Sequence, residues 1–162
     1  RDVAPSRGLG DVYKRQLERE YLQQSISQNL GVKVELNTVG DYQMFANERD
    51  NKNYDIFVGG WFSDYNDPLD FLNVMKTGVY DSYGLYSNSE YDSLIDSLTG
   101  ENDNAKRLEI YQKLEDLLVA QDCGVAPLYY SDKHYYYQNW VKDFYTSSFG
   151  ASQELYRASV QK

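Results

Sequence analysis

The chain has little of several residue types that carry chemistry. Its 162 residues include one cysteine (Cys123), one histidine (His134) and three prolines. A single cysteine excludes an internal disulfide and a metal site built from several cysteines, so we expect Cys123 to be a buried structural thiol. No apolar run approaches the roughly 20 residues of a membrane-spanning helix. A phosphate loop, a nucleophile elbow and histidine–cysteine metal spacing are also lacking, so no cofactor or metal site is predicted.

Basic residues are scarce as well. The chain has 25 acidic and 16 basic residues and a net charge of −9. This balance argues against nucleic acid as a partner, because binding to phosphates needs clustered Lys and Arg. Tyrosine is abundant, with 17 copies. It combines a large contact area with a hydroxyl group, which suits surfaces that grip ligands, although tyrosines also cover sheet edges and loops.

The length suffices for one domain with a substantial core. Residues 1–16 differ from the rest because they have no helical or strand period and contain Pro5, Gly8 and Gly10. We interpret residues 1–16 as a non-native linker and exclude them from the fold.

Predicted helices and strands alternate over the next part of the chain. A helix is expected at residues 17–30, ended by Gly31, and a short helix at 42–49, capped by Asp41. Strands are expected at 32–36 and 54–58. Helix, strand, helix, strand is the pattern of an α/β fold with crossovers between parallel strands.

The second half is predicted to be mostly helical. Helices are expected from Pro68 to Lys76, from the cap Asn88 to Leu98, and over residues 105–121. The last helix has a stripe expected to face the core: Leu108, Tyr111, Leu114 and Leu118. Further strands are predicted at 125–130, 134–137 and 155–160.

The run from Tyr54 to Leu72 is the most informative. A buried strand opens through two glycines into a loop rich in aromatic and polar residues. An aromatic and a carboxylate delivered together at the carboxyl end of a strand are typical of a ligand cleft in an open α/β sheet. We therefore predict a ligand-binding site made of Gly60, Trp61, Asp64, Tyr65 and Asn66.

Asp64 is the main candidate within this loop. A carboxylate partly shielded from water binds an ammonium group through a charge-assisted hydrogen bond. Simpler interpretations remain open: Asp64 as a turn-forming residue, Trp61 as a packed aromatic, and Gly59 and Gly60 as a bend.

Two other classes of protein must be weighed. Asp64, Asp67 and Asp70 raise the alternative of a carbohydrate-active enzyme, which needs two carboxylates at a fixed separation with different pKa values. A structural α/β domain whose aromatic residues simply fill the core is the other alternative. His134, alone among tyrosines, is expected to be a surface or strand residue. We predict no catalytic residue.

Several segments resemble one known family, and they occur in that family's order. They are Gly-Trp-Phe-Ser-Asp-Tyr-Asn-Asp-Pro (60–68), Phe-Leu-Asn (71–73), Leu-Gly-Val-Lys-Val-Glu-Leu (30–36), Tyr-Asp-Ser-Leu-Ile-Asp (91–96), Arg-Leu-Glu-Ile-Tyr-Gln-Lys-Leu-Glu (107–115) and Ala-Pro-Leu-Tyr-Tyr (126–130). Together they resemble the extracellular solute-binding proteins of family 5, the oligopeptide- and dipeptide-binding components of ABC importers. The resemblance extends over residues 17–160.

The resemblance implies a fold and a site. The fold is α/β, the C-terminal part of a type II periplasmic-binding-protein-like fold, a partial lobe with a mixed sheet and flanking helices. Residues 17–125 would form part of the second ligand-binding lobe, and residues 126–162 would return toward the first lobe. Trp61 and Asp64 match a Trp-x-x-Asp pattern in which the aspartate receives a peptide's ammonium group and the tryptophan lines a side-chain pocket. Some members carry a basic residue where this chain has Val58.

The resemblance also implies partners and a location. These are a peptide ligand, an ABC permease in the membrane, and an extracellular or periplasmic site anchored through an upstream lipoprotein signal. We expect a monomer that performs no covalent chemistry. Other members bind nickel complexes, haem or oligosaccharides, so these ligands remain alternatives. The isolated chain is expected to bind peptides weakly or not at all, because much of the cleft would lie in other parts of the protein.

Overall fold

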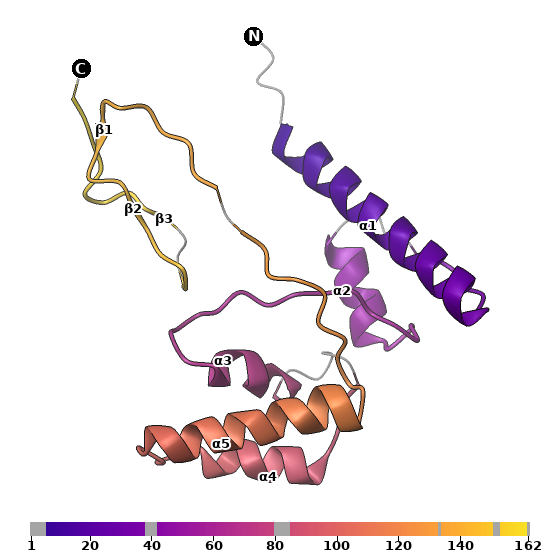
Figure 1. Cartoon of the computed structure of the whole chain (residues 1–162). Helices are drawn as coiled ribbons and strands as arrows, with labels where there is room; N and C mark the ends of the chain where they lie inside the picture. The colour runs from indigo at the N-terminus through magenta and orange to yellow at the C-terminus, as the bar shows by residue number, and fades with distance from the viewer. Residues whose placement is uncertain (1–5, 38–41, 80–84, 133, 151–152, 162) are drawn as a thin grey trace. The chain divides into compact units, whose positions relative to one another are not determined.

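The computed structural model describes residues 6–37, 42–79, 85–132, 134–150 and 153–161 (Figure 1). The chain divides into two compact units, residues 1–48 and residues 49–162. Each unit is described by itself.

The helices of the first unit are α1 (Ser6–Leu30) and the greater part of α2 (Tyr42–Asp50). α1 ends as predicted: Gly31 takes a φ of +67°, and its N–H donates to the Ser27 carbonyl at 3.1 Å. Its beginning differs, because the helix extends through residues 6–16, where no helical period was found. Once a helix is nucleated, each further residue adds a hydrogen bond, so a helix can continue into a segment of poor pattern. The linker interpretation stays a prediction, and Asp41 lies outside the described residues.

The second unit contains the remaining helices. α3 (Leu69–Leu72) continues as the short 3₁₀ helix η1 (Asn73–Met75), and α4 (Ser89–Ser97) follows. α5 (Asn104–Glu115) is extended by the π-helix η2 (Asp116–Gln121). These confirm the predicted helices. The predicted cap is also confirmed, because Asn88 Oδ1 accepts the N–H groups of Glu90 and Tyr91 at 2.8 and 3.1 Å.

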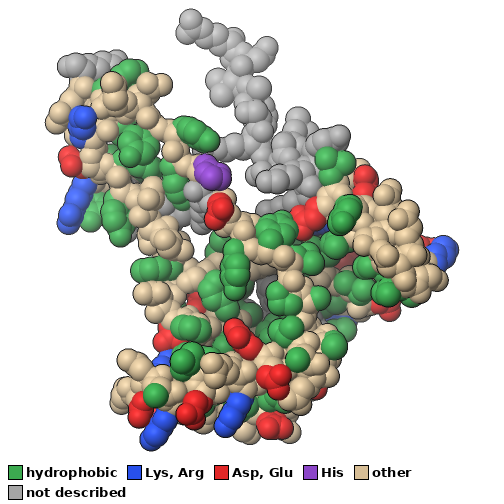
Figure 2. All heavy atoms as spheres, in the orientation of Figure 1, with side chains coloured by type: hydrophobic (Ala, Val, Ile, Leu, Met, Phe, Trp, Pro, Cys, Tyr) green, Lys and Arg blue, Asp and Glu red, His purple; other side chains and the backbone are tan. Residues whose placement is uncertain are grey.

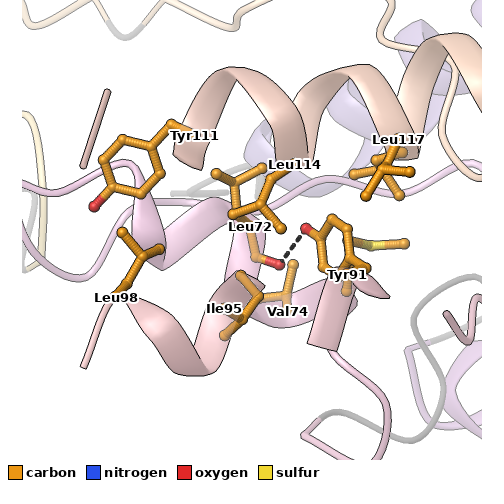
Figure 3. Close-up of a cluster of buried hydrophobic side chains, with 10 residues drawn as sticks. Leu72, Val74, Tyr91, Ile95, Leu98, Tyr111, Leu114 and Leu117 are labelled. Carbon is orange, nitrogen blue, oxygen red and sulfur yellow. Dashed lines mark hydrogen bonds between the residues drawn. The ribbon is translucent and has the colours of Figure 1, made fainter. Parts of the chain in front are cut away.

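These helices enclose the core of the second unit (Figure 3). Its buried members are Leu72, Val74, Met75, Tyr91, Ile95, Leu98, Tyr111, Leu114, Leu117 and Leu118. Tyr91 and Leu114 are fully buried, and the Tyr91 hydroxyl donates to the Leu72 carbonyl at 2.7 Å. That bond satisfies two polar groups inside the core and joins α4 to α3.

Three expectations about burial were wrong. Ile56, in the segment 54–58 that was predicted as a buried strand, is 70% exposed. Leu108 is 57% exposed, because the first turn of α5 instead contacts the loop before α3 and the α4–α5 connection through Arg107. Cys123 is exposed rather than buried. It follows η2 with a φ of +51°, while the next residue, Gly124, packs against Tyr86 and Leu118.

The described strands are short and antiparallel. β1 (Val141–Lys142) pairs with β4 (Ser159–Val160), and β2 (Tyr145–Thr146) pairs with β3 (Gln153–Glu154). β4 confirms only the end of the strand predicted at 155–160. Within the described residues, segments 32–36, 54–58, 125–130 and 134–137 form no strand. A strand needs a neighbour to accept and donate hydrogen bonds, and the Val34 carbonyl instead accepts the Gln23 side-chain amide at 2.7 Å.

Many large apolar side chains lie on the surface (Figure 2). Tyr130 and Tyr136 are each 94% exposed, whereas Tyr91 and Tyr111 belong to the core. Tyrosine therefore occurs both on the surface and in the core of the second unit, and its predicted role in gripping ligands stays a prediction. His134 is exposed, as expected of a surface residue. Among the described helices, none is both long and apolar enough to cross a membrane.

Candidate ligand-binding loop

The predicted site lies in the loop that leads into α3. Asp67 forms the turn at its end: its N–H donates to the Tyr65 carbonyl at 3.0 Å, and its Oδ1 accepts the Leu69 N–H at 2.9 Å. Pro68 follows with a φ of −55°, already in the helical region. An aspartate that bonds the backbone two residues ahead, followed by proline, begins a helix without straining the chain.

A buried carboxylate joins the two main predicted residues. Asp70, in α3, is 6% exposed. Its Oδ2 accepts the Trp61 indole N–H at 3.2 Å and the Asp64 backbone N–H at 2.7 Å. The Trp61 indole and the Asp64 backbone therefore donate hydrogen bonds to the same acceptor oxygen of Asp70. The sequence had raised Asp70 only as one of several carboxylates for an alternative enzyme.

Trp61 and Asp64 differ in exposure. Trp61 is half-buried and packs against the core, which agrees in part with the simple interpretation of a packed aromatic. Asp64 is exposed, and no group in the described part of the chain forms a hydrogen bond or an ion pair with its carboxylate. A solvent-facing carboxylate can accept hydrogen bonds from a cationic N–H group.

The other predicted residues lie on the surface of the same loop. Tyr65 is 46% exposed, and Gly60 and Asn66 are exposed. A Cβ added at Gly60 would meet nothing within 4 Å, so no close neighbour explains this glycine. At Gly59, a Cβ would lie 2.3 Å from the Phe57 ring, which accounts for the glycine there.

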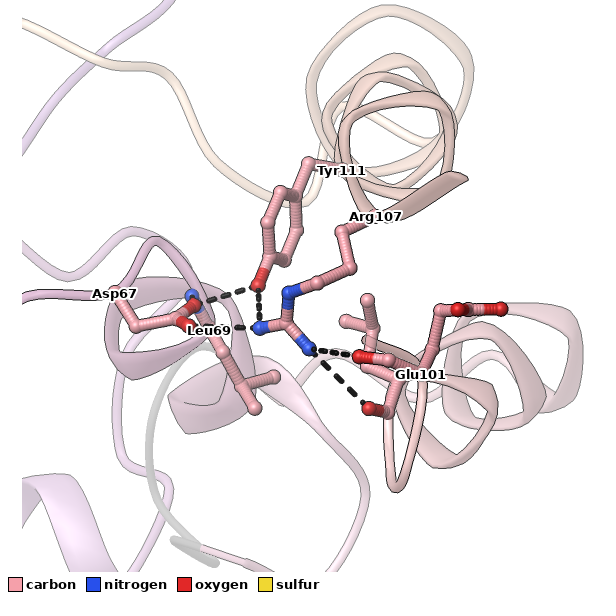
Figure 4. A network of polar contacts seen from close by, with 6 residues as sticks. Asp67, Leu69, Glu101, Arg107 and Tyr111 are labelled. Carbon is pink, nitrogen blue, oxygen red and sulfur yellow. Dashed lines mark hydrogen bonds and ion pairs between the residues drawn. The ribbon is translucent and has the colours of Figure 1, made fainter. Parts of the chain in front are cut away.

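The end of the loop is bound to α5 by a polar network (Figure 4). Asp67 Oδ2 accepts from Arg107 Nη2 at 2.7 Å, and Asp67 Oδ1 accepts the Tyr111 hydroxyl at 2.5 Å. Arg107 Nη1 also donates to the carbonyls of Leu98 and Glu101 at 3.3 and 3.2 Å. One guanidinium therefore joins α5, the α4–α5 connection and the loop.

This network shifts the pKa values of Asp67 and Tyr111. Burial alone would raise the pKa of Asp67, but hydrogen bonds from Tyr111 and Leu69 and the Arg107 charge outweigh it and lower the pKa below 3.8. Burial, followed by the hydrogen bond to Asp67 and its negative charge, raises the pKa of Tyr111 to about 12. Asp67 is held ionised, and Tyr111 is held as a neutral donor.

A third contact comes from the C-terminal segment. The Gly150 N–H donates to the Ser63 carbonyl at 2.7 Å. Gly150 has a φ of +64°, and a Cβ there would lie 3.2 Å from the Asp64 carbonyl oxygen. Glycine suits this position because it adopts positive φ at little cost and leaves room for the loop.

Sequence reasoning missed the roles of Asp70, Arg107, Tyr111 and Gly150. Arg107 and Tyr111 are four residues apart on a helix, which indicates a shared face, but their partner Asp67 is 40 residues from Arg107 and gives no local signal. No group of His, Cys, Asp and Glu within the described residues could hold a metal ion.

Residues 10–82 match the family model described as bacterial extracellular solute-binding proteins, family 5 middle. Over these residues the chain is similar to this family. The family recognised from the ordered segments is thus confirmed, and its proteins bind solutes outside the cytoplasm.

Curated relatives of this family include the oligopeptide-binding protein OppA of Bacillus subtilis, 32% identical over 124 residues. The periplasmic oligopeptide-binding protein OppA of Salmonella typhimurium is 32% identical over 113 residues. These matches cover 75% and 70% of this chain, but only 21% and 20% of the two relatives. The chain therefore spans about a fifth of the length of such proteins.

Solved structures of the family share the fold. The substrate-binding domain of an oligopeptide ABC transporter from Bacillus anthracis superposes with a TM-score of 0.77 at 29% identity, covering 88% of this chain and 28% of that one. The pheromone receptor PrgZ gives a TM-score of 0.72 at 28% identity, covering 88% and 27%. The expected class, part of a periplasmic-binding-protein-like fold, is therefore confirmed.

Proposed function

We propose that this chain forms part of the ligand-binding region of the oligopeptide-binding subunit of an ABC importer. The relatives named for oligopeptide binding and the superposable substrate-binding domain support this function. Within that assignment, residues 17–125 contribute to the second lobe and residues 126–162 return toward the first. The protein performs no covalent chemistry.

At the site, the Asp64 carboxylate receives the peptide's ammonium group, and Trp61 lines a side-chain pocket. One observation carries this assignment: the Asp64 carboxylate is exposed and unengaged by described residues, while its backbone N–H and the Trp61 indole are held on the same oxygen of Asp70. An ammonium group binds a carboxylate more strongly where a neighbouring indole excludes water from one side. Gly60, Tyr65 and Asn66 contribute further exposed surface of the same loop.

The arrangement of the other carboxylates disfavours a carbohydrate-active enzyme. A glycosidase needs a carboxylic acid whose pKa is raised so that it can protonate a leaving group. The pKa of Asp67 is lowered instead, and Asp67 is bound to Arg107 and Tyr111. Asp70 is occupied by two N–H donors. Neither carboxylate is arranged as the acid partner of Asp64.

The partners and the location follow from the proposed function. The loaded protein delivers peptide to a membrane permease and works as a monomer outside the cytoplasm. A lipoprotein signal upstream of this sequence anchors it to the membrane. Nickel complexes, haem and oligosaccharides are the competing ligands, and an ammonium-binding Asp64 favours peptide over sugar.

The test uses calorimetric titration of a protein that carries this sequence at the length of its relatives. Asp64→Asn removes the negative charge with little change of shape, so affinity for free-amine peptides should fall about tenfold or more, equivalent to at least about 1.4 kcal/mol. Affinity for the same peptides with acetylated N-termini should change much less. Asp96→Asn is the matched control, because Asp96 is an exposed acid that belongs to α4 and pairs with Lys76 rather than with a residue of the loop.

Equal losses for free and acetylated peptides would contradict the ammonium role of Asp64. Binding of an oligosaccharide, but no peptide, by the unaltered protein would overturn the peptide assignment.

A further inference from the structure

We propose that Asp70 is the positioning residue of this loop. In this role it does not contact the ligand but sets the orientation of the Trp61 indole and of the backbone at Asp64. The consequence for ligand binding rests on the proposed function, whereas the effect on loop geometry can be measured without any ligand.

The geometry makes Asp70 a shared support. One oxygen, Oδ2, accepts both the Trp61 indole N–H and the Asp64 backbone N–H, at 3.2 and 2.7 Å. The first bond fixes the direction of a side chain, and the second fixes the main chain that carries the ligand-facing carboxylate. A shift of Oδ2 therefore displaces both the Trp61 indole and the Asp64 backbone, and loss of Oδ2 removes a hydrogen bond from each.

Asp70 is itself held by rigid structure. It lies in α3, where its N–H donates to the Asp67 carbonyl at 3.1 Å, and its side chain is buried. α3 packs against α5, and Leu72 belongs to the core. A binding group on a loop keeps its geometry only if a neighbouring residue on a packed element orients it. Asp70 connects the core to the loop in this way.

Two substitutions of Asp70 distinguish the effect of its acceptor oxygen from the effect of its volume. Asp70→Asn keeps one carbonyl oxygen at the same reach, and because both donors meet a single oxygen, the amide can accept both bonds. Asp70→Leu has a similar size but no acceptor, so the two N–H groups lose this partner. A role that depended only on volume would tolerate leucine better than a role that depended on the oxygen.

The ligand-free test is NMR of the chain itself. The sequence has two tryptophans, Trp61 and Trp140, so Trp140→Phe assigns the Trp61 indole N–H signal. In the unaltered chain this proton should exchange with water about tenfold more slowly than that of Trp140, whose residue is 41% exposed. Asp70→Leu should shift the Trp61 indole and Asp64 amide signals and remove the protection, and Asp70→Asn should retain both.

Asp92→Leu is the matched control. The Asp92 carboxylate accepts the Thr77 backbone N–H at 3.0 Å, and neither residue belongs to the loop. It should leave the Trp61 and Asp64 signals unchanged. Unchanged signals in Asp70→Leu would overturn the proposal. If Asp70→Leu fails to fold, equally fast exchange of the two indole protons in the unaltered chain would overturn it just as well.

Titration of a protein with this sequence at the length of its relatives adds the functional readout. Asp70→Leu should lower the affinity for free-amine and for acetylated peptides alike, by about tenfold or more, because it disturbs both Trp61 and Asp64. Asp70→Asn should bind nearly as the unaltered protein does. NMR shifts with no peptide binding by the unaltered protein would overturn the proposed function and leave the positioning role intact. Normal peptide affinity in Asp70→Leu would overturn the positioning role in binding.

Discussion

Arg107 donates from Nη2 to Oδ2 of Asp67 at 2.7 Å and so ties α5 to the end of the candidate binding loop. Both side chains are largely shielded from solvent, with relative exposures of 19% and 31%. Tyr111, one turn further along α5, donates to the other oxygen of the same carboxylate. The start of the loop is held by Asp70 and its end by this network, so the loop is attached to the helical core at both ends.

We expect the Asp67–Arg107 bond to contribute measurably to stability. Asp67→Asn should lower the free energy of unfolding by about 1 to 2 kcal/mol, because a partly buried, charge-assisted hydrogen bond is lost. Urea denaturation measures this loss. A double-mutant cycle with Arg107→Gln should give a coupling of about 1 kcal/mol, and coupling near zero would contradict the assignment.

The ion pair between Lys76 and Asp96 provides the control for that cycle. The Asp96 side chain is 66% exposed, so the carboxylate end of the pair lies in water, whereas the Lys76 side chain is 23% exposed. Asp96→Asn should therefore cost less than about 1 kcal/mol in the same measurement.

The lowered pKa of Asp67 predicts a specific acid sensitivity. A carboxylate whose folded pKa lies below its unfolded value of 3.8 stabilises the fold above that value. This stabilisation is lost as the pH falls through the lower, folded pKa. The free energy of unfolding of the unaltered chain should therefore fall more steeply below pH 3.8 than that of Asp67→Asn. Parallel curves of stability against pH would contradict this account.

The core of the second unit predicts a contrast between two leucines of α5. Leu114 is fully buried, so Leu114→Ala should cost about 3 kcal/mol through lost burial and the cavity left behind. Leu108 is 57% exposed, so Leu108→Ala should change stability by less than about 0.5 kcal/mol. Thermal and urea unfolding measure both. A comparable loss of stability in both variants would contradict the exposed position of Leu108 and support the core position that the sequence predicted.

Gly150 predicts a contrast between two glycines of positive φ. Gly150→Ala and Gly100→Ala should each cost about 1 kcal/mol, because alanine is strained at φ values of +64° and +82°. Only Gly150→Ala should also shift the NMR signals of Ser63 and Asp64, because a Cβ there lies 3.2 Å from the Asp64 carbonyl oxygen. At Gly100 a Cβ meets nothing within 4 Å, so the loop signals should stay unchanged.

The helices could be predicted because their signals are local. The cap at Asn88, the stop at Gly31 and the proline that opens α3 act on backbone groups within a turn of themselves. The burial of individual side chains was harder to predict from the sequence. Leu108 has the spacing of a core residue, yet the neighbouring Arg107 makes the contacts on that turn.

The strands were the weak part of the prediction. Alternating or continuous apolar residues favour extended chain, but a strand forms only when another segment supplies a ladder of hydrogen bonds. The segments predicted at 32–36 and 54–58 have no such ladder among the described residues. The short pairs that are present join residues near the carboxyl end of the chain, and of their strands only β4 lies within a predicted strand.

By itself, the sequence established the family, the helices and the loop that carries Trp61 and Asp64, because these depend on residue order and short-range contacts. Only the tertiary structure decided how the loop is held. Asp70 gathers Trp61 and Asp64 on one oxygen, Arg107 and Tyr111 bind Asp67 across 40 or more residues, and Gly150 meets Ser63. Such pairings depend on which packed elements become neighbours, and spacing along the chain does not encode that choice.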